Sequence, residues 1–253
     1  MLKLAEKEDI KKIESFCKSF PLGVHTNCKL SAYGLERDFF KVWYAFSSNK
    51  INAVISYFDG SVILCAESDA DLEEIAAFVS TYGYESVCAE KSIFDRCGFK
   101  AASEKTMFKF TQNDCLLQPC ENVCDMKKVY DLISRSIPDS FAQSEEAYLH
   151  FLSDFTFRQR RNLARVKAVF ENNKLLSCAL TAAEIENAAL ISGVACDSEA
   201  RGKGLGKRTV LSLANELQKE KKAVYVIALN DSAKAFYKKI GFNKCCTVMY
   251  AER

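Results

Sequence analysis

Residues 194–206 read Val-Ala-Cys-Asp-Ser-Glu-Ala-Arg-Gly-Lys-Gly-Leu-Gly, and this stretch indicates the local fold of the chain. Apolar residues typical of a strand come first, a short polar turn follows, and the glycines lead into a helical pattern. Glycine has no Cβ, so its backbone N–H groups can approach a ligand closely. The N-terminus of a helix favours an anion, because its first N–H groups have no partner within the helix. We therefore interpret this stretch as a strand–loop–helix unit that holds a phosphate group.

The spacing of the glycines excludes two common phosphate-binding motifs. A dinucleotide-binding loop has Gly-x-Gly-x-x-Gly, but Lys207 stands at the third glycine position when Gly202 and Gly204 fill the first two. A nucleotide P-loop needs Ser or Thr where this chain has Arg208. The pattern that remains is Arg-x-x-Gly-x-Gly, which begins at Arg201.

A second block follows the helix expected over residues 206–222 and the apolar strand expected over residues 223–229. Residues 230–242 read Asn-Asp-Ser-Ala-Lys-Ala-Phe-Tyr-Lys-Lys-Ile-Gly-Phe. Asp231 or Ser232 can cap a short helix here, and the glycine before the final Phe suits a left-handed residue after its end. The block therefore predicts a helix that carries a tyrosine.

With these two blocks in this order, the chain resembles the GNAT superfamily of acetyl-CoA-dependent N-acetyltransferases. The resemblance implies an α+β fold of the three-layer GNAT type, with a mixed, mostly antiparallel sheet flanked by helices. It also implies acetyl-CoA as co-substrate, no metal, and transfer of the acetyl group to a primary amine.

The resemblance assigns the pyrophosphate of coenzyme A to the glycine loop and its pantetheine arm to the backbone of the preceding strand. The implied coenzyme-binding residues are Val194, Ala195, Cys196, Arg201, Gly202, Lys203, Gly204, Leu205, Gly206, Lys207 and Asn230. At Cys196 the expected contact is the backbone rather than the thiol.

Two residues are candidates for the proton transfers. The resemblance implies Tyr237 as general acid, because a phenol is protonated at neutral pH and can meet a departing thiolate; alternatively, its ring packs on the sheet. The strand at residues 189–193 carries no carboxylate, so Glu184 is the candidate base, acting through a water. The alternative for Glu184 is a solvent-exposed carboxylate in a hairpin.

The N-terminal half contains a similar block. Residues 87–99 align without gaps on residues 230–242. The Gly-Phe pair that ends the first segment matches the pair that ends the second, and Phe94 stands at the position of Tyr237. Strands are expected over residues 41–47, 51–57 and 61–65, with turns between them. We expect a second, degenerate copy of the same fold; the alternative is an unrelated α+β domain with a chance match.

The degenerate copy lacks the features of an anion site. Between Cys65 and Leu72 the sequence reads Ala-Glu-Ser-Asp-Ala-Asp, without glycine and with acidic residues that repel a pyrophosphate. We therefore predict two GNAT-like domains, residues 1–111 without a coenzyme loop and residues 112–253 with the catalytic site.

Composition limits the partners. The 35 Lys and Arg residues nearly balance the 33 Asp and Glu residues, so no overall field selects a nucleic acid or a membrane. The sequence shows no apolar leader and no membrane-spanning segment, and it contains 12 cysteines. Because disulfide frameworks belong to secreted proteins, we expect a reduced, cytoplasmic protein. Cys115, Cys120 and Cys124 lack Cys-x-x-Cys pairs and a nearby His, so incidental thiols in a linker are favoured over a metal site.

A basic run could receive an acidic or carboxylate-bearing acceptor or contact RNA, although a solvated face is the more common meaning of such a run. It comprises Arg158, Arg160, Arg161, Arg165 and Lys167. His25 and His150 are isolated and are interpreted as structural.

The sequence predicts an N-acetyltransferase, monomeric or homodimeric, whose acceptor is a small-molecule or peptide amine. Two alternatives are a non-catalytic module that binds acyl-CoA and a transferase for a longer acyl chain.

Overall fold

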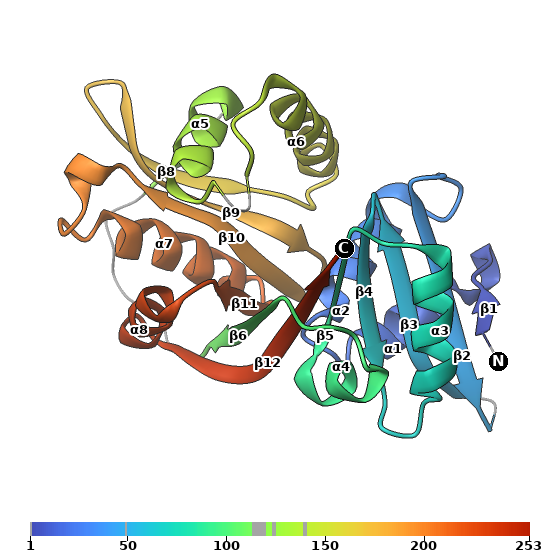
Figure 1. The fold of residues 1–253 in the computed structure, drawn as a ribbon. Coiled ribbons are helices and arrows are strands. Elements are labelled where there is room, and N and C mark those ends of the chain that lie inside the picture. Colours follow the sequence, from blue (N-terminus) through green and yellow to red (C-terminus); the bar gives the residue numbers. More distant parts are fainter. Residues whose placement is uncertain (1, 49, 113–119, 123–124, 139–140) are drawn as a thin grey trace. The chain divides into compact units, whose positions relative to one another are not determined.

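The computed structural model describes residues 2–48, 50–112, 120–122, 125–138 and 141–253 (Figure 1). By its internal contacts the chain divides into two compact units. The first unit comprises Met1–Phe108, Ala228–Lys234 and Lys244–Arg253, and the second comprises Lys109–Ile227 and Ala235–Asn243. The first unit thus contains two segments from the C-terminal part of the chain. The proposed division into residues 1–111 and 112–253 stays a prediction.

The sheet of the first unit has the strand order β1-β2-β3-β4-β5-β12-β6. Its strands are β1 (Leu2–Leu4), β2 (Phe40–Ser47), β3 (Lys50–Phe58), β4 (Ser61–Ala66), β5 (Ser86–Glu90), β6 (Ser103–Phe110) and β12 (Phe242–Glu252). Its helices are η1 (Lys7–Asp9), α1 (Ile10–Cys17), α2 (Gly23–Tyr33), α3 (Leu72–Tyr82) and α4 (Lys91–Cys97). Strands β4 and β5 are parallel, and β1–β2, β2–β3, β3–β4 and β5–β12 are antiparallel.

The three-stranded meander expected near the start of the chain is confirmed as β2, β3 and β4. Its second turn has Asp59 at φ 46° and Gly60 at φ 78°, as a tight hairpin turn requires. Successive residues of the strands enter different cores, because side chains alternate across a sheet. Val54 packs with α1 and α2 on one face, and Ile55 packs with α3 and α4 on the other.

The gapless alignment of the two similar blocks is correct only in part. From Lys91 onward both segments form a helix followed by a glycine of positive φ, 70° at Gly98 and 96° at Gly241. Before Lys91 the alignment is wrong, because β5 continues to Glu90 and runs directly into α4. The N-terminal helix therefore lacks the first turn of its C-terminal counterpart, α8 (Asp231–Lys239).

The sheet of the second unit has the strand order β11-β10-β9-β8-β7. Its strands are β7 (Glu121–Asn122), β8 (Val166–Glu171), β9 (Lys174–Glu184), β10 (Ala188–Cys196) and β11 (Ala223–Ala228). Its helices are α5 (Met126–Ser136), α6 (Glu145–Gln159), η2 (Ser198–Ala200) and α7 (Leu205–Lys219), and it includes most of α8. Strands β10 and β11 are parallel, whereas β7–β8, β8–β9 and β9–β10 are antiparallel.

Helices cover both faces of this second sheet: α5 and α6 lie on one side of β8–β10 and α7 lies on the other (Figure 1). Helix α5 buries Val129 and Ile133 in a core with Val166 and Leu180 of the strands. Helix α7 buries Val210, Leu213, Ala214 and Leu217, the apolar stripe that its sequence period predicts. The predicted α+β fold, with mixed sheets between helices, is confirmed.

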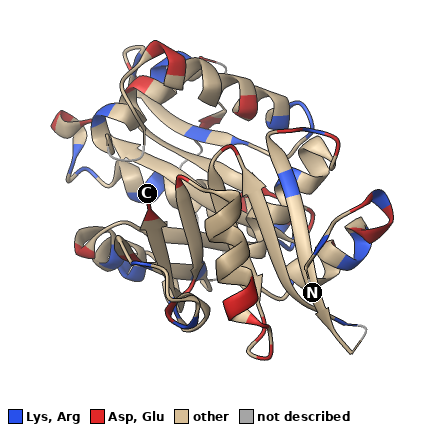
Figure 2. Cartoon of the chain, turned by 45° about the vertical axis from the view of Figure 1, so that its right-hand side comes forward, with Lys and Arg blue, Asp and Glu red and all other residues tan. Residues whose placement is uncertain are grey.

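Charged residues of both signs alternate along the helices and loops, while most strand residues are uncharged (Figure 2). Among the described residues, no helix is long and apolar enough to cross a membrane.

Candidate active site

The glycine loop between β10 and α7 has the backbone that its sequence predicts. Gly202 and Gly204 both have φ of 78°, and Gly204 is the N-cap of α7 in the left-handed conformation. A residue with a side chain is strained in this conformation, which explains both glycines. Among the described residues, no heavy atom lies within 4 Å of the place that a Cβ would take on either glycine, so this part of the chain leaves open space at the loop.

The first turn of α7 supplies unpaired backbone donors. Its first backbone hydrogen bond within the helix runs from the N–H of Arg208 to the carbonyl of Gly204, at 3.0 Å. The N–H groups of Leu205, Gly206 and Lys207 therefore have no acceptor within the helix, at the end where the helix dipole is positive. The open space, the donors and the side chain of Lys203 fit the pyrophosphate of a coenzyme.

Strand β10 leaves its parallel neighbour before it reaches this loop. The pairing with β11 runs from Ala188–Ala223 to Ile191–Val226. In the described residues β10 continues to Cys196 paired only with β9, through Ala195–Cys178 and Cys196–Ser177. One backbone edge of Val194, Ala195 and Cys196 is thus available to an extended ligand, as a strand edge is to a peptide.

Gly193 lies at a bulge of β10 just before this available edge, and the sequence analysis did not single it out. It lies in the register shift between Ser192 and Ala195, with φ of 52°. A Cβ at this position would lie 2.8 Å from Cδ1 of Ile133 and 2.9 Å from Cγ of Leu180. A lone glycine inside a strand is a known signal of a bulge and could have identified it.

Tyr237 lies in α8 and is only 6% exposed. Its ring contacts Phe236 and Phe242, with centroids 5.2 and 5.6 Å apart, and burial raises the pKa of its phenol above the usual value. Phe236 in turn reaches the glycine loop, since its Cζ lies 3.9 Å from the place of a Cβ on Gly206. Tyr237 is therefore protonated at neutral pH and sits one residue from the contact between α8 and α7.

Asn230 caps α8. Its Oδ1 accepts a hydrogen bond from the N–H of Ala233 at 2.9 Å, and it belongs to the segment Ala228–Lys234 of the first unit. Its predicted contact with the coenzyme stays a prediction.

Glu184 is not brought near the glycine loop. It pairs with Ala189 across the β9–β10 hairpin, and the seven steps from Ala189 to Cys196 span roughly 23 Å at about 3.3 Å per residue. Its side chain is 0% exposed and binds Arg165 and Lys222, the latter at 2.6 Å. The interpretation as a solvent-exposed hairpin carboxylate is wrong, and the assignment as base has no geometric support.

Cysteine chemistry does not explain the site. Burial raises the pKa of the half-buried Cys196 thiol, which keeps it protonated, in agreement with a backbone role. Cys115 and Cys124 lie outside the described residues, and the thiol of Cys120 donates to the carbonyl of Arg208 at 3.7 Å. Among the residues that the structure describes, no group of His, Cys, Asp and Glu could hold a metal ion.

Arg158, Arg165 and Lys167 of the basic run are held in ion pairs inside the protein, so the expected solvated face is wrong for these three residues, whereas Arg160 and Arg161 are exposed. Arg158 is buried against Asp154, at 2.7 Å. Arg165 binds Glu184, Glu216 and Glu220, Lys167 binds Glu216, and Arg161 stacks on the ring of Phe157.

The corresponding loop of the first unit is closed by the chain itself. The carboxylate of Asp71 accepts the N–H of Glu74 at 3.0 Å and so caps α3, where an anion would bind. Arg96 of α4 donates to the carbonyl of Ser68 at 2.8 Å and ties the loop down.

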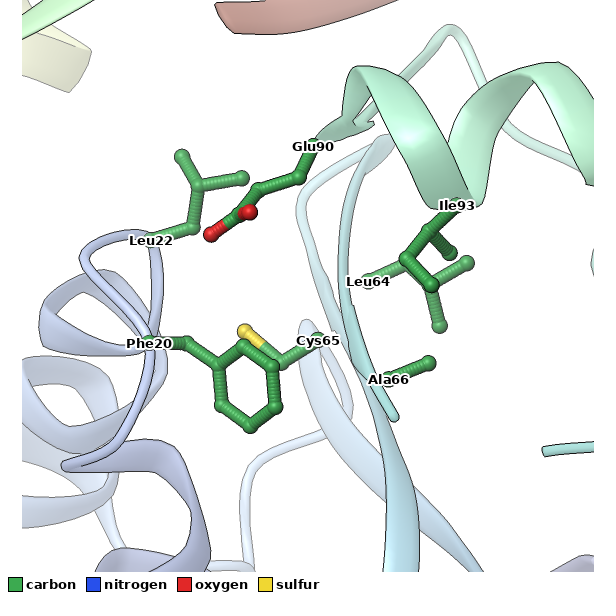
Figure 3. A pocket seen from close by; sticks show the side chains of 7 residues that line it. All are labelled: Phe20, Leu22, Leu64, Cys65, Ala66, Glu90 and Ile93. Carbon is green, nitrogen blue, oxygen red and sulfur yellow. The ribbon is translucent and has the colours of Figure 1, made fainter. Parts of the chain in front are cut away.

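Side chains also fill the space between the ends of β4 and β5. Their parallel pairing ends at Leu64–Ala89, and beyond it Cys65 and Glu90 face Phe20 and Leu22 from the segment before α2 (Figure 3). The space left between them is about 10 Å³. That is room for about one water and not for a pantetheine arm.

Comparison with known proteins gives a family and a fold. Residues 126–242 match the model of the acetyltransferase (GNAT) family. No curated protein matches the sequence.

Solved structures resemble the whole chain. A GCN5-related N-acetyltransferase from Sphaerobacter thermophilus has a TM-score of 0.66 at 10% identity, covering 100% of this chain and 95% of that one. A tandem GNAT protein from the clavulanic acid biosynthesis pathway has a TM-score of 0.62 at 11% identity, covering 100% and 98%. A GNAT-family acetyltransferase from Colwellia psychrerythraea has a TM-score of 0.60 at 12% identity, covering 100% of both chains.

Identities this low show the fold alone, but the family match falls on the glycine loop, the irregular strand and the tyrosine helix described above. Residues 126–242 of this chain therefore belong to the acetyltransferase (GNAT) family.

Proposed function

We propose that the second unit transfers an acetyl group from acetyl-CoA to a primary amine. The observation that carries this proposal is the loop at Gly202 and Gly204, whose open face and unpaired N–H groups lie at the end of a strand with a free backbone edge. A pyrophosphate on the first turn of α7 and a pantetheine arm along Val194–Cys196 would use both features at once.

The chain's own residues supply binding and one proton. When bound, acetyl-CoA supplies the thioester that the amine attacks. The backbone of Val194–Cys196 orients this thioester, and the protonated phenol of Tyr237 donates a hydrogen bond or a proton to the departing thiolate sulfur. Because burial raises the pKa of this phenol, a hydrogen bond from the neutral group is the main contribution that we assign to it.

One observation favours a second candidate, a non-catalytic module that binds acyl-CoA. The strand segment 189–193 has no carboxylate, and Glu184 is held in ion pairs, so neither of these two places supplies a base that could deprotonate an ammonium. Transfer then relies on the fraction of amine that is already neutral, which rises with pH.

We infer further that the first unit is a degenerate copy without a coenzyme site and that the protein acts in the cytoplasm. The cap from Asp71 and the filled space around Glu90 support the first inference. The described cysteines form no disulfide with one another, which supports the second. We propose that the active form is a monomer or homodimer and that its partners include neither a nucleic acid nor a membrane. An acyl-CoA with a longer acyl chain stays an alternative donor.

The test replaces Gly204 with Glu. At about 100 times its dissociation constant, acetyl-CoA should stabilise the parent protein by ~2.7 kcal/mol, measured as a rise in the unfolding temperature. Gly204→Glu should abolish this rise and the release of free thiol in the presence of amines, because the new carboxylate enters the anion site.

The matched control is Gly98→Glu. Gly98 is also left-handed, with φ of 70°, and has open space at its Cβ among the described residues, but it follows α4 in the first unit. It should show a similar strain and a normal response to acetyl-CoA. An unchanged thermal shift in Gly204→Glu would rule out the assigned loop, and coenzyme binding without thiol release from any amine would favour the non-catalytic module.

A further inference from the structure

Two adjacent cysteines lie on β12, in the segment Lys244–Arg253 that belongs to the first unit. Among the cysteines that the structure describes, Cys245 is the one that is exposed to solvent, and Cys246 beside it is half-buried. The proposed acetyl transfer uses neither of them. An accessible thiol next to a second thiol is an arrangement typical of sites for reversible oxidation.

The strand is irregular where these cysteines lie. In a regular strand, adjacent side chains point to opposite faces of the sheet. Here Asn243, Lys244 and Cys245 are exposed at three successive positions, without the alternation of buried and exposed residues. In the described residues, the pairing of β12 with β5 begins only at Val248. The backbone of the two cysteines is therefore not held by β5.

The two thiols contact each other. The Cys246 thiol donates a hydrogen bond to the Cys245 sulfur, and this bond lowers the pKa of Cys245 below its usual value. The same contact, together with burial, raises the pKa of Cys246. In its protonated form Cys245 donates to the carbonyl of Met107 on β6 at 3.3 Å, which holds its sulfur in place. The exposed thiol is thus the one that ionises more easily, and the thiolate is the reactive form.

We propose that Cys245 and Cys246 form a site that a hydroperoxide oxidises reversibly, with Cys245 as the attacking thiolate and Cys246 as the resolving thiol. First, the Cys245 sulfur attacks a peroxide oxygen: an S–O bond forms, the O–O bond breaks and hydroxide leaves. Then the Cys246 sulfur attacks the Cys245 sulfur: an S–S bond forms, the S–O bond breaks and hydroxide leaves. The two thiol protons convert both hydroxides to water, so the thiols are oxidised and the peroxide is reduced.

The disulfide that results is easily reversed. Adjacent Cα atoms are about 3.8 Å apart across a trans peptide bond. Disulfides usually join Cα atoms that are about 4.4–6.8 Å apart, and a strained disulfide is easier to reduce. A dithiol such as dithiothreitol should therefore restore both thiols, whereas it would not restore a sulfinic acid.

The experiment treats the reduced full chain with hydrogen peroxide, alkylates the remaining thiols and analyses the tryptic peptides by mass spectrometry. Trypsin cleaves after Lys244, so residues 245–253 form one peptide that holds both cysteines and no other. This peptide should lose two hydrogen atoms and take up no alkyl group, and dithiothreitol should restore two thiols. Cys245 should be oxidised at least about 10-fold faster than the half-buried Cys97, because burial raises the pKa of Cys97 to about 11.

Two variants separate the two roles. Cys246→Ser should leave a sulfenic acid on Cys245, which dimedone traps. Cys245→Ser should keep Cys246 as a thiol at the peroxide concentration that oxidises the parent. Cys97→Ser, also in the first unit, is the matched control and should form the disulfide at the parent's rate. Thermal unfolding checks that each variant is folded.

Three results would overturn the inference. They are oxidation of Cys245 no faster than that of Cys97, a sulfinic acid in place of the disulfide, and a disulfide between Cys245 and any cysteine other than Cys246. The measurement uses the mass of one peptide and no turnover, so its outcome does not depend on the proposed acetyl transfer.

Discussion

Tyr237 illustrates how one side chain can have a structural and a chemical role. Its ring is enclosed by Phe236 and Phe242, so the ring stabilises the junction of α8 with the start of β12. The same burial holds the phenol in its protonated form. Removing the hydroxyl alone separates the two roles.

Tyr237→Phe should lower kcat by roughly 10²–10⁴-fold if the phenol stabilises the departing thiolate. Coenzyme affinity should change little, because the N–H groups of α7 remain. The hydroxyl contributes at most about 1–2 kcal/mol to folding through an ordinary hydrogen bond, so the variant should fold. Steady-state kinetics, calorimetry with coenzyme A and thermal unfolding measure the three effects.

The control is Tyr250→Phe, which removes the hydroxyl of a half-buried tyrosine in the first unit and should keep full turnover. Equal rates for Tyr237→Phe and the parent would assign the proton to water.

At the scale of elements, a group of charged residues joins α7 to the strands. Arg165, just before β8, binds Glu184 at the end of β9, Glu216 on α7 and Glu220, the C-cap of α7. The hydrogen bond from Arg165, together with the charge of Lys222, lowers the pKa of Glu220 to about 2. These contacts fix the C-terminal half of α7, while its N-terminal turn faces the proposed coenzyme.

This group predicts a specific pH dependence. The pKa of Glu220 in the folded state is below its ordinary value of 4.5, so its stabilising effect is complete above about pH 4.5 and is lost as the pH falls toward 2. Glu220→Gln should therefore lower the free energy of unfolding at pH 7, and the difference from the parent should shrink between about pH 4.5 and pH 2. Urea unfolding at several pH values measures it.

Glu171→Gln, which removes an exposed carboxylate at the end of β8, is the control for the substitution itself. A constant deficit for Glu220→Gln down to pH 2 would contradict the ion-pair explanation.

At the scale of the whole molecule, the two compact units are not two consecutive halves of the sequence. Residues Val248–Glu252 of β12 pair with Ser86–Glu90 of β5 inside the first unit. A fragment that ends near residue 112 therefore lacks a strand neighbour of β5. Coenzyme binding by the first unit is better tested in the full chain.

The full chain should bind one acetyl-CoA, because Asp71 and the side chains around Glu90 occupy the corresponding places in the first unit. Isothermal titration should give a stoichiometry near one, and Gly204→Glu should remove all binding. A stoichiometry near two, or binding that survives this substitution, would show a second site and contradict the degenerate copy.

The sequence by itself determined the features that depend on neighbouring residues. The loop at Gly202 and Gly204, the start of α7 and the end of α8 follow from backbone conformation and from hydrogen bonds within a few residues. The meander β2–β4 follows from alternating side chains and turn residues. Such features can be predicted from the neighbouring residues alone, without knowledge of distant parts of the chain.

Only the tertiary structure decided the features that depend on distant partners. Glu184 is buried because Arg165 and Lys222, 19 and 38 positions away, neutralise it there. Helix α5 packs over the bulge at Gly193 through Ile133, and β12 joins β5 across most of the sequence. A single sequence carries no local mark of such pairings, since a buried ion pair or a strand neighbour is selected by the whole set of competing contacts.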